Sequence, residues 1–499
     1  MTTPLSRRDF LARSTTFTAG ALAAPSLCLG DVGVTRPMKR VLGRTGFEVT
    51  TLGLGGQASI QWTPADVDPT ALILKALERG VNYFDTSNAY GPSQMNFGKA
   101  LRARHLVPDR PGYDERGRRS LILASKTMVR HARGSHPEVH DRTDGPPGSR
   151  AADDIKRSLS QLFGDGRGGY PDDAYLDLFF IHNLNTLAEV EAIFEGLDRP
   201  DPKADRLGAL AVLRDYRDGS NLTGLNPREE KRIRRIGISG HFSSPVMMEC
   251  LQRDHSDVID AMLIAINAND RRYQSHQFNA IPVAAAKNVG IVAMKTFADG
   301  AMYTKEPRWS QTPADVVRTV GDTRLPSRPL IEYSLATPGI GTLIIGIGEV
   351  AADARRCQLE QNLSAAQIRA QGLGEADRQE IESLADAAGK GRVNWFQVAQ
   401  AALGAPREAA ARIELRDGRR TAQLTWQTAY AADQPIRHYE LQRDGKAIAT
   451  VEHRPQTTKA PFVFEETLQS ENRPSYRVVT VDAAGRTAAT DPLAPALAG

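Results

Sequence analysis

The sequence contains little cysteine. Three cysteines occur in 499 residues, at Cys28, Cys250 and Cys357, and they lie far apart in the chain. So few cysteines exclude a disulfide-stabilised scaffold, and the absence of a cysteine cluster excludes an iron–sulfur centre. Their spacing also matches no metal site, so we expect no metal cofactor.

The sequence also lacks an excess of charge of one sign and a long hydrophobic run. It has 63 basic and 59 acidic residues, a formal net charge of +4. This charge is much smaller than the basic excess that is typical of nucleic-acid-binding proteins. The apolar stretch from Phe17 to Leu29 is too short and too interrupted to span a bilayer. We therefore expect neither a nucleic-acid partner nor a stable membrane span.

The first 30 residues are typical of an export signal. Arg7-Arg8-Asp9-Phe10-Leu11 precedes the apolar stretch, which contains the small residues Ala21-Leu22-Ala23-Ala24. This pattern resembles a twin-arginine signal peptide. We expect residues 1–30 to engage the twin-arginine translocation machinery and to direct the protein to the periplasm or otherwise outside the cytoplasm. A basic patch ahead of an irregular coil is the alternative interpretation.

The length predicts two domains, because single cores rarely exceed about 250 to 300 residues. Between residues 49 and 362 short apolar runs alternate with amphipathic stretches, which is typical of βα units. No Gly-x-Gly-x-x-Gly turn follows the first strand, so a closed (β/α)₈ barrel of the α/β class is favoured over residues 38–400. A hairpin over residues 38–50 should close its floor. The eight expected strands are residues 52–54, 81–84, 121–125, 176–181, 233–238, 261–266, 291–294 and 342–345.

Residues 408–499 have a different character. Their alternating pattern and the turns at Asp444-Gly445 and Ala484-Gly485 predict a smaller all-β sandwich. Trp426, Tyr439 and Tyr476 resemble the core of a fibronectin type III domain, with Tyr476 near its tyrosine-corner position. A generic immunoglobulin-like sandwich is the alternative.

Ionisable side chains end three consecutive strands of the predicted barrel. Asp85 ends the second strand and Tyr90 follows five residues later, Lys126 ends the third, and His182 ends the fourth. The carboxyl ends of barrel strands meet at one rim, where catalytic groups converge. We expect Tyr90 to donate a proton to a carbonyl oxygen, and His182 to orient that oxygen. Lys126 should lower the pKa of Tyr90, and Asp85 should hold Lys126 by an ion pair.

These four residues, in this order, resemble the Asp, Tyr, Lys and His tetrad of the aldo-keto reductases. Supporting segments are the residue 39–50 hairpin, Leu52-Gly53-Leu54-Gly55-Gly56, Tyr90-Gly91-Pro92-Ser93, Gly98-Lys99-Ala100-Leu101 and Gly237-Ile238-Ser239-Gly240-His241. The resemblance implies an enzyme that interconverts a carbonyl and an alcohol by hydride transfer with a nicotinamide cofactor.

The same resemblance implies a set of cofactor-binding residues. They are Ser239, Asn267, Lys295, Gly346 and Arg356. Three positions depart from the common family pattern: Gly240 replaces an asparagine, Leu263 a carboxamide-binding glutamine and Met294 a ring-stacking tyrosine. Arg356 could grip a 2′-phosphate, which favours NADP(H) over NAD(H), although Glu349 would oppose it.

The sequence therefore predicts an exported NAD(P)-dependent oxidoreductase acting on a small aldehyde, ketone or sugar. Nicotinamide dinucleotides are scarce outside the cytoplasm, so we expect the cofactor to be inserted before export and then retained. The alternative is a non-catalytic cell-envelope or glycan-binding protein whose barrel is a relic.

Overall fold

The computed structural model describes residues 36–303, 305–321, 324–399, 402–416, 419–469 and 473–497. The predicted export signal, residues 1–30, lies outside the described residues. The chain divides into two compact units. The first contains the residues up to Phe242 together with 256–269 and 288–396, and the second contains 243–255, 270–287 and the residues from Gln397 onward. Among the described residues, no helix is long and apolar enough to cross a bilayer.

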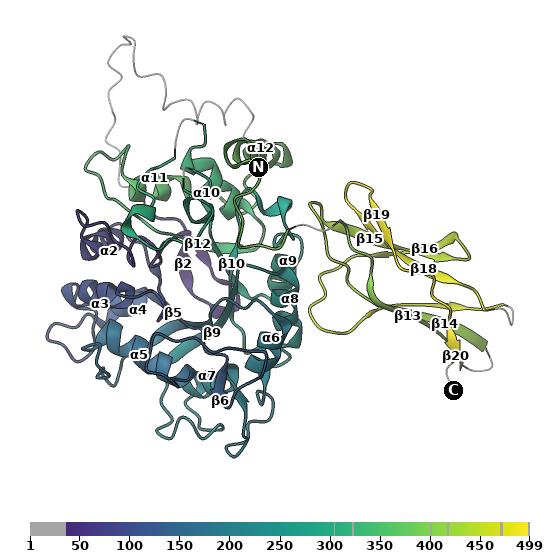
Figure 1. Cartoon of the computed structure of the whole chain (residues 1–499), viewed down its shortest axis with the longest axis horizontal. Coiled ribbons are helices and arrows are strands. Elements are labelled where there is room, and N and C mark those ends of the chain that lie inside the picture. Colours follow the sequence, from purple (N-terminus) through teal and green to yellow (C-terminus); the bar gives the residue numbers. More distant parts are fainter. Residues whose placement is uncertain are drawn as a thin grey trace, which may run out of the picture. The chain divides into compact units, whose positions relative to one another are not determined.

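The first unit contains a closed barrel of eight parallel strands, as predicted (Figure 1). The strands are buried along almost their whole length, which explains why they read as continuous apolar runs rather than alternating ones. In pairing order they are β3 (Leu52–Gly55), β4 (Tyr83–Asp85), β5 (Ile122–Thr127), β7 (Leu176–Ile181), β9 (Ile233–Gly240), β10 (Ala261–Ala265), β11 (Gly290–Met294) and β12 (Ile340–Ile345).

The second barrel strand begins two residues later than predicted. The Val81 N–H donates to the carbonyl of Ala76 in the preceding helix. The Asn82 side chain accepts from the Thr50 N–H at 2.7 Å and donates to the Glu48 carbonyl at 2.8 Å. Both residues are therefore tied to neighbouring elements, and the strand starts at Tyr83.

An antiparallel hairpin of β1 (Lys39–Val41) and β2 (Glu48–Thr50) precedes the barrel. Its turn contains a short 3₁₀ helix, η1 (Gly43–Thr45). Three apolar side chains of the hairpin are buried in one cluster with side chains from the barrel interior: Leu42, Phe47 and Val49 with Tyr83, Ile122, Leu178 and Phe180. The expectation of a closed barrel floor is confirmed.

Helices of the first unit surround the strands in Figure 1. Local signals start several of them: Asp68 caps α2 by accepting from Thr70 N at 2.8 Å, and Thr186 and Glu189 form a capping box on α6. The helices of this unit are α2 (Pro69–Glu78), α3 (Ser93–Ala103), α4 (Glu115–Ser120), α5 (Ala151–Phe163), α6 (Leu187–Phe194), α7 (Ala209–Asp218), α10 (Ser327–Ala336), α11 (Gln358–Ala365) and α12 (Glu375–Gly389), with the 3₁₀ turns η3 (Ala298–Gly300) and η4 (Pro313–Asp315).

Three stretches rich in glycine, proline or charged residues, which are typical of surface loops, contain secondary structure. Residues 108–119 include most of α4, and α7 continues to Asp218 inside residues 215–232. In residues 131–150, β6 (His131–Arg133) pairs antiparallel with β8 (Leu207–Gly208). Long-range hydrogen bonds hold this pair, because Arg133 donates to the carbonyls of Pro202 and Ala204. Local sequence carries no signal for such contacts.

The second unit contains two four-stranded sheets, in yellow-green in Figure 1. One has the order β17-β14-β13-β20 and the other β16-β15-β18-β19. Trp426, Tyr439 and Tyr476 are fully buried in the shared core. The strands are β13 (Arg407–Arg416), β14 (Arg419–Gln427), β15 (Ile436–Arg443), β16 (Lys446–Glu452), β17 (Phe462–Thr467), β18 (Tyr476–Asp482), β19 (Thr487–Ala489) and β20 (Ala496–Leu497).

The second unit also includes α8 (Ser244–Arg253), η2 (Asp270–Arg272) and α9 (Ala280–Ala286). Asn279 accepts from the Ala431 N–H at 2.8 Å and donates to its carbonyl at 3.1 Å. Gln252 donates to the Gln456 carbonyl at 2.8 Å. The predicted all-β sandwich is present, and it forms one compact unit with these helices.

The resemblance to a fibronectin type III domain stays a prediction. In a tyrosine corner the phenol bonds to a backbone group upstream. Here the Tyr476 hydroxyl donates to the side chain of Glu466 instead.

Candidate active site

The four predicted catalytic residues lie together at one rim of the barrel. Asp85 is the last residue of β4, Lys126 the penultimate residue of β5, and His182 follows β7 directly. Tyr90 lies in the loop between β4 and α3. None of the four is more than 8% exposed. The strand-end rule therefore brings together residues that are up to 97 positions apart in the chain (182 − 85).

Lys126 and Asp85 form a buried ion pair. The Lys126 ammonium donates to Asp85 Oδ1 and, at 2.9 Å, to the carbonyl of Thr86. Burial lowers the pKa of Lys126 and raises the pKa of Asp85, and each charge partly offsets the effect on the other. The second carboxylate oxygen, Oδ2, is buried without a hydrogen-bond partner among the described residues.

Gly56 makes this arrangement possible by close approach. Its N–H donates to the Asp85 carbonyl at 2.7 Å. A Cβ at this position would lie 2.7 Å from that carbonyl oxygen and 2.6 Å from Ser93 Oγ. Only glycine fits against the end of β4 here.

The Tyr90 hydroxyl lies 3.3 Å from His182 Nε2, and the two rings meet edge to face. Lys126 Nζ lies 4.9 Å from the centroid of the Tyr90 ring. The expected fall in the pKa of Tyr90 is not found. Burial, followed by the negative charges of Asp85 and Asp299, raises its pKa well above 10. The Lys126 ammonium is paired with Asp85, and burial has the larger effect on the phenol, so Tyr90 stays protonated.

His182 is neutral around pH 7. Burial, reinforced by the positive charges of Lys126 and Arg130, lowers its pKa well below 6.5. Its Nδ1 lies 3.3 Å from the Ser87 hydroxyl and its Nε2 faces Tyr90. A neutral imidazole can donate through one nitrogen and accept through the other, so His182 can orient an oxygen without competing as an acid.

A cavity of about 110 Å³ opens beside Asp85 and Tyr90. All of its lining residues belong to the first unit. Met294 lines it at the end of β11, where the family pattern has an aromatic ring, and also packs into the barrel core. Leu263 lines it as well.

Two of the five predicted cofactor residues line this cavity, namely Lys295 and Gly346. Ser239 is buried, and its hydroxyl accepts from the Asn183 N–H at 2.9 Å. Asn267 is buried, donates to the Lys295 carbonyl at 3.0 Å and pairs with the amide of Asn394. Ser239 and Asn267 thus hold neighbours of the site in place.

The fifth predicted residue, Arg356, is exposed on a turn and is not among the lining residues. Glu349, which was expected to oppose Arg356, accepts from Arg318 at 3.1 Å. The role of Arg356 in binding a 2′-phosphate stays a prediction.

The cavity wall fits a nicotinamide dinucleotide in its chemistry. The hydroxyls of Ser59 and Thr296 line it and have no hydrogen-bond partner among the described residues. Gly55 and Gly346 leave the backbone accessible at the ends of β3 and β12. Hydrogen-bond donors and bare backbone suit amide and phosphate groups, and Met294 and Leu263 suit a planar ring.

The partners of Lys295 were not predicted from the sequence. Its ammonium donates to Gln57 Oε1 at 2.7 Å and to Asp299 Oδ1 at 3.3 Å. Asp299 in turn accepts from Lys305 at 2.6 Å. Gln57 follows the glycines that end β3, and this position was the only signal that could have identified it.

The contacts of Gln358 and Arg318 were also not predicted from the sequence. Gln358 accepts from the Gly348 and Glu349 N–H groups at 2.8 and 3.0 Å, and donates to the carbonyls of Val317 and Thr319. It thereby joins the loop after β12 to the segment whose valines line the cavity.

An aromatic cluster adjoins the site. His241 Nδ1 donates to Asn183 Oδ1 at 2.7 Å, and the His241 ring lies 5.2 Å from that of Trp309. Lys295 Nζ lies 4.6 Å from the Trp309 centroid, and Phe396 stacks on Trp309.

The chain is similar to several known proteins. Residues 51–319 match the Aldo/keto reductase family. An L-galactose dehydrogenase of Arabidopsis thaliana is 24% identical over 361 residues, which cover 69% of this chain and 93% of that protein. A putative aldo-keto reductase structure from Pseudomonas aeruginosa is 20% identical, covering 67% of this chain and 97% of the other, with a TM-score of 0.39. An aldo/keto reductase from Klebsiella pneumoniae, solved with NADP and acetate, is 15% identical, covering 70% and 95%, with a TM-score of 0.40. The family match extends over more than half of the chain, and the chain therefore belongs to the aldo/keto reductase family.

Proposed function

We propose that this NAD(P)H-dependent oxidoreductase reduces a carbonyl group with Tyr90 as the proton donor, and runs in reverse from the alcohol. One observation carries the proposal. The protonated Tyr90 hydroxyl and the neutral His182 imidazole lie 3.3 Å apart beside a cavity, with the Lys126–Asp85 ion pair next to them.

A bound nicotinamide cofactor would supply the hydride. Tyr90 would give its proton to the carbonyl oxygen as charge develops there. The phenolate left behind would be stabilised by the Lys126 ammonium, which Asp85 keeps charged in a buried place. His182 would hold the oxygen by a hydrogen bond from its neutral ring.

The cofactor-binding residues that we infer are Met294 against the ring, Ser59, Thr296 and Lys295 at the cavity wall, and Gly346 near the phosphates. Arg356 would bind the 2′-phosphate, which favours NADP(H). The substrate is a small aldehyde, ketone or sugar. The likeness to an L-galactose dehydrogenase supports a sugar.

Replacing Tyr90 by Phe tests the role of the phenol. We expect kcat to fall by at least about 100-fold on a panel of aldehydes and aldoses, with the affinity for NADPH unchanged. The matched control is Tyr83→Phe, because the Tyr83 hydroxyl is also buried but has no hydrogen-bond partner among the described residues. Unchanged turnover in the Tyr90 variant would contradict its role as proton donor, whereas a wild-type protein without turnover on the panel would favour a relic barrel with a binding role.

We further propose that the protein is exported by the twin-arginine pathway with its cofactor already bound. The motif at Arg7 and Arg8 supports the route. Cell fractionation should find the protein outside the cytoplasm, and replacing both arginines by lysine should retain it inside. Protein purified from the exported fraction should carry dinucleotide detectable by mass spectrometry. Exported protein without dinucleotide would contradict cofactor retention alone.

A further inference from the structure

Tyr90 lies in a short loop whose two flanks carry buried side-chain amides. Asn88 precedes Tyr90 by two residues and Gln94 follows it by four. Asn88 is 3% exposed and Gln94 is fully buried. Burying an amide costs free energy unless its hydrogen bonds are replaced, so two buried amides around one catalytic loop require an explanation.

Both amides donate to the same hydroxyl on α5. Asn88 Nδ2 lies 2.8 Å from Ser158 Oγ, and Gln94 Nε2 lies 3.1 Å from it. Ser158 is fully buried, and its own hydroxyl donates to the Asp154 carbonyl at 2.8 Å. Donation to Asp154 leaves the lone pairs of Ser158 Oγ available for the two amides.

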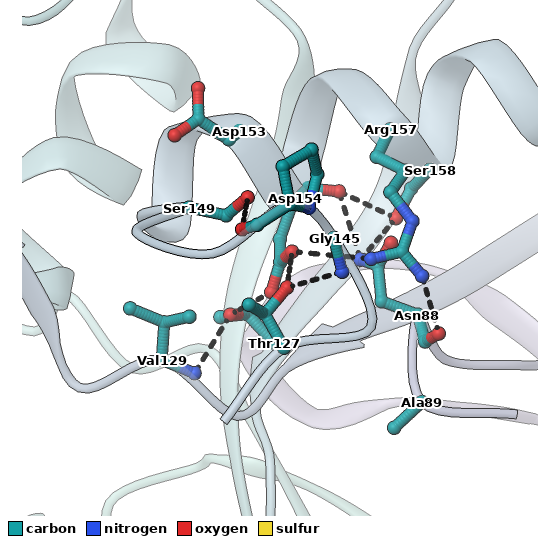
Figure 2. A network of polar contacts seen from close by, with 12 residues as sticks. Asn88, Ala89, Thr127, Val129, Gly145, Ser149, Asp153, Asp154, Arg157 and Ser158 are labelled. Carbon is teal, nitrogen blue, oxygen red and sulfur yellow. Dashed lines mark hydrogen bonds and ion pairs between the residues drawn. The ribbon is translucent and has the colours of Figure 1, made fainter. Parts of the chain in front are cut away.

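The same network reaches the strand that carries Lys126. Asn88 Nδ2 also lies 3.2 Å from the Lys126 carbonyl and 2.9 Å from the Asp154 carbonyl. Gln94 Nε2 donates to Ser125 Oγ, one residue before Lys126, at 2.6 Å. Figure 2 shows Asn88 and Ser158 side by side, with Arg157 donating to the Asn88 carbonyl at 2.9 Å.

The carboxylate of Asp154 fixes the far side of this network. It accepts from Thr127, one residue after Lys126, at 2.6 Å (Figure 2). It also accepts from Thr143 at 2.8 Å. Ser158 Oγ also lies 3.0 Å from Ser125 Oγ, so helix α5 is hydrogen-bonded to residues on both sides of Lys126 and on both sides of Tyr90. Hydrogen bonds to this one helix therefore hold both the segment that carries the Tyr90 phenol and the strand that carries the Lys126 ammonium.

We propose that Ser158 is a positioning residue for the reaction, which holds the Tyr90 loop against the Lys126 strand by accepting from Asn88 and Gln94. This inference rests on the proposed role of Tyr90. Asn88 Oδ1 and Gln94 Oε1 are buried without partners among the described residues, so the donors of these amides make all their hydrogen bonds. Loss of the common acceptor would remove one hydrogen bond from each flank of the loop, leaving Asn88 bonded to the carbonyls of Lys126 and Asp154 and Gln94 bonded to Ser125 alone.

The test is Ser158→Ala, with Ser160→Ala as the matched control. Ser160 lies on the same helix and is 1% exposed, but its hydroxyl accepts from Gly168 N at 2.8 Å, away from the loop. We expect kcat to fall about 10- to 100-fold in the Ser158 variant, with KM and the dissociation constant for NADPH changed little, because small displacements of a catalytic group are costly. The Ser160 variant should keep the kcat of the wild type.

A pH profile separates positioning from simple destabilisation. Tyr90 is faced by Asp85 on β4, Lys126 on β5, His182 after β7 and Asp299 after β11. Burial raises its pKa, so a loosened and hydrated loop should move the alkaline limb of kcat/KM to lower pH. Ser158→Thr, which keeps the hydroxyl, should restore the limb. A Ser158→Ala variant whose kcat and alkaline limb match those of Ser160→Ala would overturn the proposal.

A double-mutant cycle covers the case in which Ser158→Ala folds poorly. Asn88→Ala should give the same shift of the limb, and the two changes together should cost less than the product of their separate effects, because they act through one contact. Multiplicative effects would overturn the proposal. If the Tyr90→Phe variant is inactive and the Ser158→Ala variant is fully active, the positioning role of Ser158 is refuted and the proposed function stands. If the Tyr90→Phe variant is active, the proposed function itself is refuted.

Discussion

The barrel rim and the sandwich core both bury polar side chains, but the rim buries them as ions and the sandwich core buries them as neutral groups. At the rim, Lys126 and Asp85 are buried as ions, and burial shifts both pKa values toward the neutral forms. In the sandwich, Tyr439 and His453 are held as neutral groups, with the phenol 3.2 Å from His453 Nδ1. Buried ions are expensive and neutral pairs are not. The comparison indicates that the rim keeps its buried charges for chemistry, whereas the sandwich core keeps its buried polar groups for packing.

Removing one charge at the rim should have the largest effect. Lys126→Met leaves Asp85 as an unpaired buried carboxylate, which should cost about 3 to 5 kcal/mol of stability as well as activity. Replacing the pair by Met and Leu should recover stability without activity, as urea unfolding and turnover would show. The contrasting control is Arg443→Met in the sandwich, where a partly exposed pair with Glu466 should cost less than about 1 kcal/mol. Equal losses at the two pairs would break the comparison.

Removing an apolar group from the sandwich should affect stability alone. Trp426 is fully buried and stacks on Phe462 at 5.7 Å with an interplanar angle of 10°. Trp426→Ala should destabilise the second unit by about 3 to 5 kcal/mol. Carbonyl reduction below the unfolding temperature should persist, since the cavity is lined by the first unit. Calorimetry and turnover measured on the same preparation decide this, and a loss of kcat at full folding would contradict it.

The sequence predicted the tetrad because each member is identified by a local rule: a polar residue after a buried strand, or a fixed spacing from one. β7, at Leu176–Ile181, was predicted to the residue for the same reason. The contact between Gln57 and Lys295 joins positions 238 apart and has no local signature. The rise in the pKa of Tyr90 likewise depends on how deeply the loop is buried, which only the packed structure reveals.

Acid should destabilise the sandwich through His453. Burial lowers its pKa from 6.5 to about 4. Above pH 6.5 the ring is neutral whether the chain is folded or unfolded. As the pH falls from 6.5 to about 4, the unfolded chain binds the proton first, so stability should drop by up to about 3 kcal/mol. Thermal unfolding across this window should show the drop, and His453→Phe should remove it. If the His453→Phe variant still loses stability between pH 6.5 and 4, the loss must come from another titratable group.

Between pH 7 and 9 the barrel site should show the smallest response. The pKa of Tyr90 lies well above this window and that of His182 well below it, so the proton donor stays protonated and the imidazole stays neutral. With saturating NADPH, kcat/KM for the carbonyl substrate should vary by less than about twofold, and stopped-flow single turnovers would exclude a contribution from product release. Lys126 is the remaining group at the tetrad whose pKa burial lowers, from 10.5. A change in kcat/KM inside this pH window that Asp85→Asn shifts to lower pH would show that the Lys126 ammonium loses its proton there. The rim, like the sandwich core, would then bury a neutral group rather than an ion.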